Sequence, residues 1–331
     1  MIIVKTPLRL SFVGGGSDLQ GFYGTKAGQV ICTTIDKYVY AIVKERFDNQ
    51  IYLNYSKKEV ASRVEDIQHD LIREALKMTG VTHGVEITTL ADIPSSGSGL
   101  GSSSAVTVAL LHALYTYQNQ LVTAEQLARE ACEIEIDILG KPIGRQDQYA
   151  VAYGGINRFV FNKDHRVDRH TIQINSQELR KFAASILLFF TGLTRSADTI
   201  LAQQSQNIQK PDTFTLLSQM VDLVEPFTTA MQNGDLYTCA ELLEKNWQLK
   251  SQLAAGISTP EINQMYETAK KAGALAGKIA GAGGGGFMML LADRSAQTDI
   301  FNAMTAYREF PFKFEMSGSK IIFDDRSYSS K

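Results

Sequence analysis

The feature that most constrains this chain is a run of glycines and serines at residues 94–105, with the sequence Pro-Ser-Ser-Gly-Ser-Gly-Leu-Gly-Ser-Ser-Ser-Ala. The run lies between a strand-like segment, residues 85–90, and a segment whose apolar residues recur at helical spacing. Glycines allow sharp turns, and a helix N-terminus offers unpaired N–H groups and a positive dipole end. The run therefore predicts a phosphate-binding loop suited to a triphosphate, with a flexible Gly/Ser linker as the alternative. It is not a Walker A loop, because the Gly-Lys-Ser/Thr ending is absent.

A second glycine-rich segment, residues 280–286, matches the dinucleotide-binding pattern at Gly281, Gly283 and Gly286. The apolar residues 287–291 that follow are typical of a buried strand, so no helix N-terminus would face a pyrophosphate. We expect a strand-to-strand loop that packs against a ligand or against the first glycine run. A purely structural turn and an NAD-binding site are the alternatives.

A third segment, residues 9–18, ends a strand-like run with the sequence Arg-Leu-Ser-Phe-Val-Gly-Gly-Gly-Ser-Asp. A charged residue such as Arg9 is unusual within an apolar strand. On a half-exposed strand Arg9 would face solvent, and Asp18 would cap the following turn. A role in ligand binding is the alternative to these two structural interpretations.

Carboxylates between residues 133 and 147 indicate further chemistry. Phosphoryl transfer needs one carboxylate to share Mg²⁺ with the phosphates and another to orient or deprotonate the attacking hydroxyl. Glu135 and Asp147 could divide these tasks. Because helical residues two apart point in different directions, Glu133 and Glu135 cannot face the same site, and we expect the other to be solvated.

Composition argues against several kinds of partner. With 33 Lys and Arg against 35 Asp and Glu, the formal charge of -2 leaves no basic excess for nucleic acid or an anionic membrane surface. No segment approaches the roughly 18 consecutive apolar residues of a membrane helix, and the N-terminus begins with a β pattern rather than a targeting leader. Cys32, Cys132 and Cys239 lie far apart without metal-ligand spacing. We therefore expect a cytoplasmic protein whose cysteines are small buried hydrophobes.

The order of strand-like and helical segments predicts an α+β chain with two domains, residues 1–170 and 171–331. Residues 162–169 are expected to form a hairpin loop near the boundary. The second domain is predicted to be rich in helices, at residues 197–209, 214–231, 236–254 and 260–272, with closing strands at 312–316 and 320–323.

Taken together, residues 7–18, 94–105 and 278–287 resemble the three motifs of the GHMP small-molecule kinases, in the order found in that family. The resemblance implies a ribosomal protein S5 domain 2-like N-terminal domain, a ferredoxin-like C-terminal domain, and ATP and Mg²⁺ as cofactors. Residues 8–18 and 140–149 are most similar to the branch that phosphorylates heptose 7-phosphates. This implies transfer to the anomeric hydroxyl, giving a 1,7-bisphosphate for the synthesis of nucleotide-activated heptose.

One departure from the family's sequence pattern narrows the choice of acceptor sugar. Residues 14–17, Gly-Gly-Gly-Ser, stand where galactokinases have a Gly-Glu-His-Thr type of sequence, which argues against galactose. A fucose-type sugar 1-kinase and a non-catalytic sensor of ATP and sugar are the alternatives. The presence of Arg9, Glu135 and Asp147 argues against a sensor, because a sensor has no need of a base.

The resemblance also implies roles for individual residues. Asp147 is the expected catalytic base, Arg9 the residue beside the transferred phosphoryl group, and Ser103 and Glu135 the ligands of Mg²⁺. The triphosphate is expected to contact Pro94, Ser96, Gly97, Ser98, Gly99, Leu100, Gly101, Ser102, Ser103 and Ser104. The phosphosugar is expected to contact Gly16, Ser17, Asp18, Arg195, Gly283 and Gly284.

The distal phosphate of such a substrate needs a second anion site. Arg195 stands where a strand ends and a helix begins, so its side chain and nearby N–H groups could hold this phosphate. Lys141 and Arg145 are rival candidates, and a solvated Arg195 is the structural alternative. The oligomeric state is left open, a homodimer included.

Overall fold

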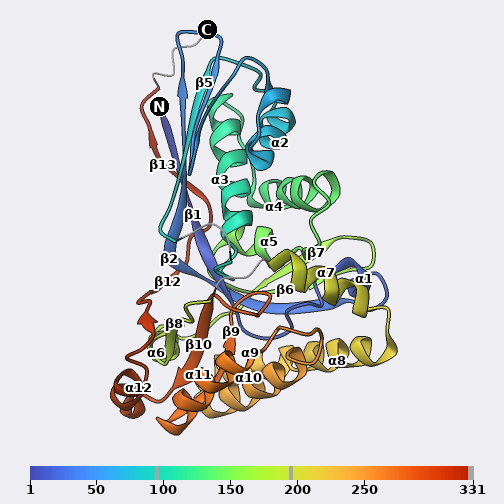
Figure 1. Cartoon of the computed structure of the whole chain (residues 1–331), viewed down its shortest axis with the longest axis vertical. Coiled ribbons are helices and arrows are strands. Elements are labelled where there is room, and N and C mark those ends of the chain that lie inside the picture. The colour runs from blue at the N-terminus through green and yellow to red at the C-terminus, as the bar shows by residue number, and fades with distance from the viewer. Residues whose placement is uncertain (94–96, 194–196, 327–331) are drawn as a thin grey trace.

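The computed structural model describes residues 1–93, 97–193 and 197–326. These residues form a nine-stranded sheet and a four-stranded sheet. In Figure 1 the larger sheet and its helices form the upper part of the molecule, and the smaller sheet lies below it against a layer of long helices. This mixture of sheets and helices without regular alternation confirms the predicted α+β class.

The larger sheet is organised by β2 (Gly28–Glu45), which is long enough to pair with several strands. It lies antiparallel to β1 (Ile2–Ser11) along most of its length, to β5 (Val85–Ala91) at one end and to β6 (Ile156–Phe161) at the other. The sheet order is β13-β1-β2-β5-β3-β4, and outside this order β6 pairs with both β2 and β7. The remaining strands are β3 (Ile51–Asn54), β4 (Lys58–Ala61), β7 (Val167–Thr171), β12 (Phe314–Glu315) and β13 (Lys320–Asp324).

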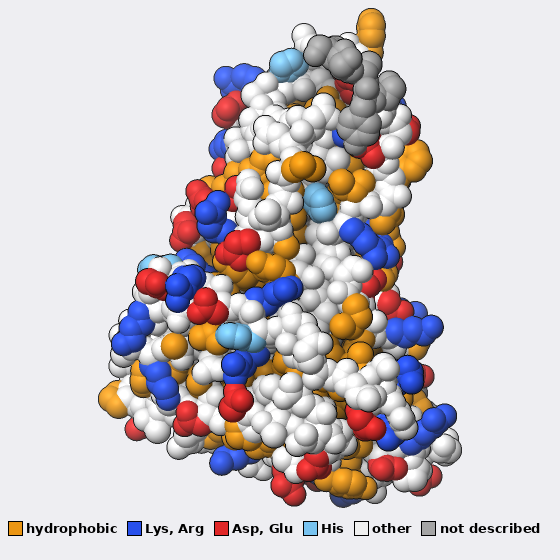
Figure 2. Space-filling model, turned by 180° about the vertical axis from the view of Figure 1, so that it is seen from behind, with side chains coloured by type: hydrophobic (Ala, Val, Ile, Leu, Met, Phe, Trp, Pro, Cys, Tyr) orange, Lys and Arg blue, Asp and Glu red, His pale blue; other side chains and the backbone are white. Residues whose placement is uncertain are grey.

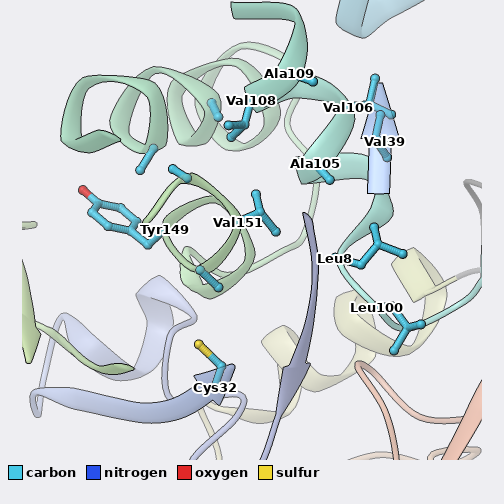
Figure 3. Packing of buried hydrophobic residues seen from close by; sticks show 14 of the residues in the cluster. Leu8, Cys32, Val39, Leu100, Ala105, Val106, Val108, Ala109, Tyr149 and Val151 are labelled. Atoms are coloured by element: carbon cyan, nitrogen blue, oxygen red, sulfur yellow. The ribbon is translucent and has the colours of Figure 1, made fainter. Parts of the chain in front are cut away.

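Helices cover one face of this sheet, with α3 (Ser102–Tyr117) against β1 and β2. A helix that is apolar on nearly all sides has to be buried, and most residues of α3 are. Figure 3 shows Ala105 and Val106 of α3 close to Val39 of β2, with Val151 of α5 (Gln146–Tyr153) nearby. The other elements of this part are α1 (Gln20–Tyr23), η1 (Val64–Asp66), α2 (Asp70–Thr79), α4 (Ala124–Cys132) and the π-helix η2 (Glu133–Ile138).

The smaller sheet is antiparallel, in the order β11-β8-β10-β9. Its strand β10 (Phe287–Ala292) lies between β8 (Ile186–Phe190) and β9 (Ala274–Ile279). It is buried throughout because its side chains alternate between two hydrophobic clusters, one on each face of the sheet. The edge strands are β9 and β11 (Arg308–Glu309). The helices are α6 (Ser176–Ala184), α7 (Ala197–Asn207), α8 (Pro211–Asp222), α9 (Val224–Gln232), α10 (Leu236–Lys250), α11 (Pro260–Lys271) and α12 (Gln297–Ala303), preceded by the short η3 (Arg294–Ala296).

Two predicted details are wrong for physical reasons. The single helix predicted at 214–231 is two helices, α8 and α9, which meet at Leu223. Pro226 lies in the first turn of α9, where its missing N–H breaks no intrahelical bond. In one continuous helix it would lack the bond to the carbonyl of Asp222 and would clash with the preceding turn. The hairpin loop predicted at 162–169 is shorter, because β7 already begins at Val167 and pairs with β6.

The last strands of the chain return to the larger sheet. β13 pairs with β1, and β12 pairs with β2, although both follow all the helices of the smaller sheet. The predicted boundary between residues 170 and 171 stays a prediction, and these two strands lie beyond it in the sequence.

Within the described residues, no helix is both long and apolar enough to span a membrane. Basic and acidic side chains are interspersed on the face shown in Figure 2, as the nearly balanced composition leads one to expect.

Candidate active site

A cavity of about 550 Å³ brings together the segments that the sequence singled out. Its lining comes from the end of β1, the glycine turn that follows, the loop before α3 and the segment 141–147. The helices α7 and α10 and the second glycine loop complete the wall. The cations Arg9, Lys141 and Lys250 line it together with Asp18, Asp147 and Asp198. Cationic side chains are therefore available to a phosphate locally, although the whole chain carries -2.

The predicted phosphate loop forms one wall of this cavity. Gly97, Ser98, Gly99, Gly101, Ser102, Ser103 and Ser104 line it. Leu100 is buried in the core instead; its N–H donates to Ser98 Oγ at 3.3 Å, and its carbonyl accepts from the N–H of Arg9 at 2.9 Å. Pro94 and Ser96 lie outside the described residues. None of the described side chains caps the start of α3, so its first N–H groups are free of a side-chain partner.

The second glycine loop packs directly against the first. A Cβ on Gly99 would lie 2.3 Å from the carbonyl oxygen of Ala280, and one on Gly281 would lie 2.6 Å from Gly99 Cα. Both glycines also have positive φ, +73° and +70°. Of the two partners expected for this segment, a ligand or the first glycine run, contact with the first glycine run is confirmed. The NAD alternative loses its basis, because Gly286 leads into β10 and not into a helix.

Arg9 and Asp147 form a bidentate ion pair inside the cavity. Nε and Nη2 of Arg9 each donate to one carboxylate oxygen of Asp147 at 2.7 Å, and Nη1 donates to the carbonyl of Gly99. The Arg9 side chain is 5 % exposed and that of Asp147 is 28 % exposed. The interpretation that Arg9 faces solvent is therefore wrong. Asp147 is held at the start of α5 with part of its carboxylate open to the cavity.

Asp18 lies next to this pair. Its carboxylate accepts from the N–H of Gly16 at 2.9 Å and from the N–H of Gln146 at 3.2 Å, so it joins the glycine turn to α5. The interpretation of Asp18 as a cap for the following turn is therefore wrong, because its partners lie elsewhere. Burial, followed by the charge of Asp147, raises the pKa of Asp18.

The other residues predicted to contact substrate are in different situations. Gly16 lines the cavity, but the hydroxyl of Ser17 is buried, donates to the carbonyl of Gly14 and accepts from the N–H of Gln29. A structural role for Ser17 follows. Gly283 and Gly284 lie against Ile257, while Gly281 and Ala282 line the cavity. This placement does not support substrate contacts for these two glycines. Arg195 lies outside the described residues.

Glu135 is fully buried behind the phosphate loop, in the π-helix η2. It accepts from Ser103 Oγ at 2.6 Å, Ser104 Oγ at 2.8 Å and Gln148 Nε2 at 2.7 Å. Burial raises the pKa of Glu135, and the nearby Lys141 ammonium is the strongest opposing influence. Glu133 is exposed, which confirms that the two acids face different ways.

The fit of these residues to Mg²⁺ depends on their donor atoms. The described residues hold no group of three His, Cys, Asp or Glu placed to bind a metal ion together. Ser103 Oγ and Glu135 Oε1 are hard oxygen donors that lie beside the phosphate loop. Because Mg²⁺ is commonly held by one or two carboxylates together with substrate phosphates and water, this pair fits a metal shared with a nucleotide.

Several residues of the site were not predicted. Lys250 of α10 and Gln204 of α7 line the cavity from the helical part of the chain. Lys278 is buried and donates to the carbonyls of Ser11 and Phe12, both at 2.9 Å, so it ties β9 to the end of β1. Of the rivals for the distal phosphate, Lys141 lines the cavity, whereas Arg145 donates to the carbonyl of His165 outside it. The periodicity of the sequence does not indicate that Lys250, Gln204 or Lys278 belongs to the site.

An uncapped helix start behind a glycine loop, with an arginine-paired aspartate directly beside it in a cavity of small-molecule size, defines a site for phosphoryl transfer to a small molecule. Family comparison agrees with this class. Residues 54–155 match the GHMP kinases N-terminal domain and residues 227–309 match the GHMP kinases C-terminal domain. The chain belongs to the GHMP kinases, a family that uses ATP as phosphoryl donor.

Relatives of similar length strengthen this assignment. The chain is 29 % identical to D-glycero-alpha-D-manno-heptose 7-phosphate kinase of Campylobacter jejuni, over 96 % of this chain and 98 % of that protein. The crystal structure of a D-glycero-D-manno-heptose 1-phosphate kinase from Bacteroides thetaiotaomicron matches with a TM-score of 0.81 and 25 % identity, covering 99 % of this chain and 100 % of that one. That of a putative sugar kinase from Campylobacter jejuni matches with a TM-score of 0.78 and 28 % identity, covering 97 % of each.

Proposed function

We propose that this kinase transfers the γ-phosphoryl group of ATP to the anomeric hydroxyl of D-glycero-D-manno-heptose 7-phosphate, giving the 1,7-bisphosphate for the synthesis of nucleotide-activated heptose. The observation that carries the proposal is the Arg9 and Asp147 pair, which joins the phosphate loop through Gly99 and adjoins Asp18. The likeness to a heptose 7-phosphate kinase over nearly the whole chain supports the choice of acceptor.

In this proposal the N–H groups of the loop at 97–104 and of the first turn of α3 bind the triphosphate. Asp147 accepts the proton of the attacking hydroxyl, because its partly exposed carboxylate keeps lone pairs that Arg9 does not use. Arg9 offsets negative charge on the transferring group. Asp18 accepts hydrogen bonds from sugar hydroxyls beside the base.

Ser103 and Glu135 would hold Mg²⁺, which, when bound, neutralises charge on the β- and γ-phosphates. Glu135 is prepared for this by Ser104 and Gln148, which hold its carboxylate in one orientation. Lys141 lies 3.3 Å from Ser103 Oγ and 3.8 Å from Glu135 Oε1, so it adds positive charge on the same side of the loop.

The test is identification of the product after incubation with Mg-ATP. The panel contains heptose 7-phosphate, heptose 1-phosphate, free heptose and fucose, and phosphorus NMR locates the new phosphate. We expect the fastest turnover with heptose 7-phosphate and a new phosphate on the anomeric oxygen. A new phosphate at any other position contradicts the proposal, and so does a preference for free fucose.

A sensor without catalysis is the competing function. The bidentate pairing of Asp147 and the fully buried Glu135 are costly arrangements that a binding protein does not need. Release of ADP that depends on the sugar would exclude the sensor. Tight sugar binding with no ADP release across the panel would establish it.

A further inference from the structure

We propose that Lys250 and Gln204 form a second anion-binding wall of the cavity, on the acceptor side, and that they bind phosphate oxygens of the phosphorylated sugar. The inference rests on the proposed function, which requires an acceptor that carries its own phosphate. Both residues belong to helices of the second half of the chain, and neither lies in the three glycine-rich segments.

Lys250 is a buried ammonium that lines the cavity. It is the last residue of α10, it is 5 % exposed, and it donates to the carbonyl of Gly281 at 2.5 Å. An ammonium carries three N–H donors, and Lys250 forms no ion pair with a carboxylate of the described residues. With one carbonyl as its hydrogen-bond partner in the described part of the chain, this buried ammonium keeps donors that an anionic ligand can use.

The position of the Lys250 ammonium is set by the glycine turn. A Cβ on Gly15 would lie 3.8 Å from Lys250 Nζ, so the ammonium lies against the backbone just before Asp18. One turn earlier on α10, Asn246 accepts from the N–H of Gly14 at 3.0 Å and holds the helix against this turn. Burial lowers the pKa of Lys250 to about 8, and the charge of Asp18 is the strongest influence that opposes this.

Gln204 reaches the same turn independently from α7. Its side chain is 1 % exposed and lines the cavity, and its Nε2 has no hydrogen-bond partner in the described part of the chain. A Cβ on Gly16 would lie 2.3 Å from this Nε2, so a glycine is required for the amide to reach the turn. A buried amide donor without a partner calls for an explanation, and an oxygen of a ligand in the cavity that Gln204 lines supplies one.

These two groups supply a charged donor and a neutral donor beside Asp18, which itself can only accept hydrogen bonds while ionised. Hydroxyls of a sugar suit Asp18, whereas phosphate oxygens suit an ammonium and an amide N–H. Phosphate oxygens can come from the acceptor's own phosphate, which we propose, or from the transferring γ-phosphoryl group. The two sources differ in how a variant responds to sugars with and without a phosphate.

The experiment compares Lys250→Met and Gln204→Met with matched controls, Lys245→Met on α10 and Gln203→Met on α7, which change exposed side chains of the same helices. We expect Lys250→Met to raise KM for heptose 7-phosphate by about tenfold to a hundredfold, the loss of one charged hydrogen bond. KM for ATP and turnover of the unphosphorylated heptose should change less than about threefold. Gln204→Met should act in the same direction by a smaller factor, and the controls should match the wild type.

A second measurement does not depend on turnover. Inorganic phosphate and heptose 7-phosphate should each raise the Tm of the wild type more than that of Lys250→Met, and a cooperative melting transition of the variant without ligand shows that it is folded. If Lys250→Met lowers kcat/KM equally for phosphorylated and unphosphorylated sugar, the oxygens that Lys250 binds belong to the γ-phosphoryl group. This result would overturn the assignment to the acceptor's phosphate. An unchanged KM together with an unchanged Tm response would overturn the anion site altogether. If the wild type phosphorylates no sugar, the proposed function fails, and the Tm comparison still decides the role of Lys250.

Discussion

Arg9 and Asp147, 138 residues apart in the sequence, meet through two parallel hydrogen bonds of 2.7 Å. The same guanidinium donates to the carbonyl of Gly99 in the phosphate loop. One side chain therefore connects the end of β1, the loop before α3 and the start of α5. Two parallel bonds restrict both rotation and translation, so the Asp147 carboxylate has one orientation toward the cavity.

Replacement of Asp147 tests the predicted base. We expect Asp147→Asn to lower kcat about a hundredfold or more, because the amide cannot accept the proton of the hydroxyl, while affinity for an ATP analogue changes little. Steady-state kinetics and calorimetric titration measure the two quantities. The exposed Asp212→Asn on α8 is the control for loss of one negative charge. Undiminished turnover in Asp147→Asn would remove this residue from the mechanism.

Contact between the two glycine loops is tested at Gly281. In Gly281→Ala the new methyl group would lie 2.6 Å from Gly99 Cα, so the phosphate loop has to shift and KM for ATP should rise. Gly192→Ala is the control, because Gly192 also has positive φ, +75°, but nothing lies within 4 Å of its Cβ position. In the control, the strain of an L-residue at positive φ should lower the free energy of unfolding by about 1–2 kcal/mol, and KM for ATP should not change. Equal KM values for ATP in the two variants would show that the close contact does not shape the loop.

Removal of the buried carboxylate tests the metal ligands. Glu135→Gln should raise the Mg²⁺ concentration needed for half-maximal turnover about tenfold, because a neutral amide is a weaker ligand for a hard cation. This Mg²⁺ concentration is measured by titrating the activity with Mg²⁺ at saturating ATP. Glu133→Gln is matched in chemistry and lies two residues away, but its side chain is exposed, so its Mg²⁺ dependence should follow the wild type. A common Mg²⁺ dependence for both variants would place the metal elsewhere.

Acid should destabilise the protein through His112 of α3. Burial lowers the pKa of His112 from 6.5 to about 4, and Nδ1 lies 2.8 Å from Ser319 Oγ. Between these two values the unfolded chain binds a proton that the folded protein does not. The stabilisation that the folded protein gains from neutral His112 is therefore complete above pH 6.5. As the pH falls from 6.5 toward 4, the free energy of unfolding falls by up to about 1.4 kcal/mol per pH unit.

Urea unfolding at pH 7, 5.5 and 4.5 measures this slope. His112→Asn should show a flatter dependence than the wild type, and the exposed His83→Asn should keep the wild-type slope. Identical slopes in His112→Asn and the wild type would assign the acid sensitivity to other groups.

Much of the site was predictable because its chemistry is local. The turn at 97–101 needs backbone conformations that glycine adopts most easily, and the apolar spacing after Gly101 indicates where α3 begins. The caps at Thr123 and Thr259, which accept from Gln126 and Ile262, were predictable for the same reason. The opposite directions of Glu133 and Glu135 followed from helix geometry alone.

The rest depended on which distant surfaces meet. Nothing in the residues around Lys250 or Gln204 distinguishes them from other polar residues on helices, and only the packing of α7 and α10 against the turn at 14–16 brings them to the cavity. Likewise, the sequence shows Ser17 as part of a motif, but it does not show that the Ser17 hydroxyl forms its hydrogen bonds with backbone groups of Gly14 and Gln29. The return of β12 and β13 to the larger sheet also leaves no mark in their own short sequences.

By itself, the sequence determined the loop that can hold phosphate, the helix that follows it and the acidic residues suited to phosphoryl transfer, since each depends on the conformations of neighbouring residues. Only the tertiary structure decided that Arg9 pairs with Asp147, that the second glycine loop supports the first, and that Lys250 enters the same cavity. Such pairings are selected by the packing of the whole core, and contacts between residues far apart in the chain have no local periodicity from which they could be predicted.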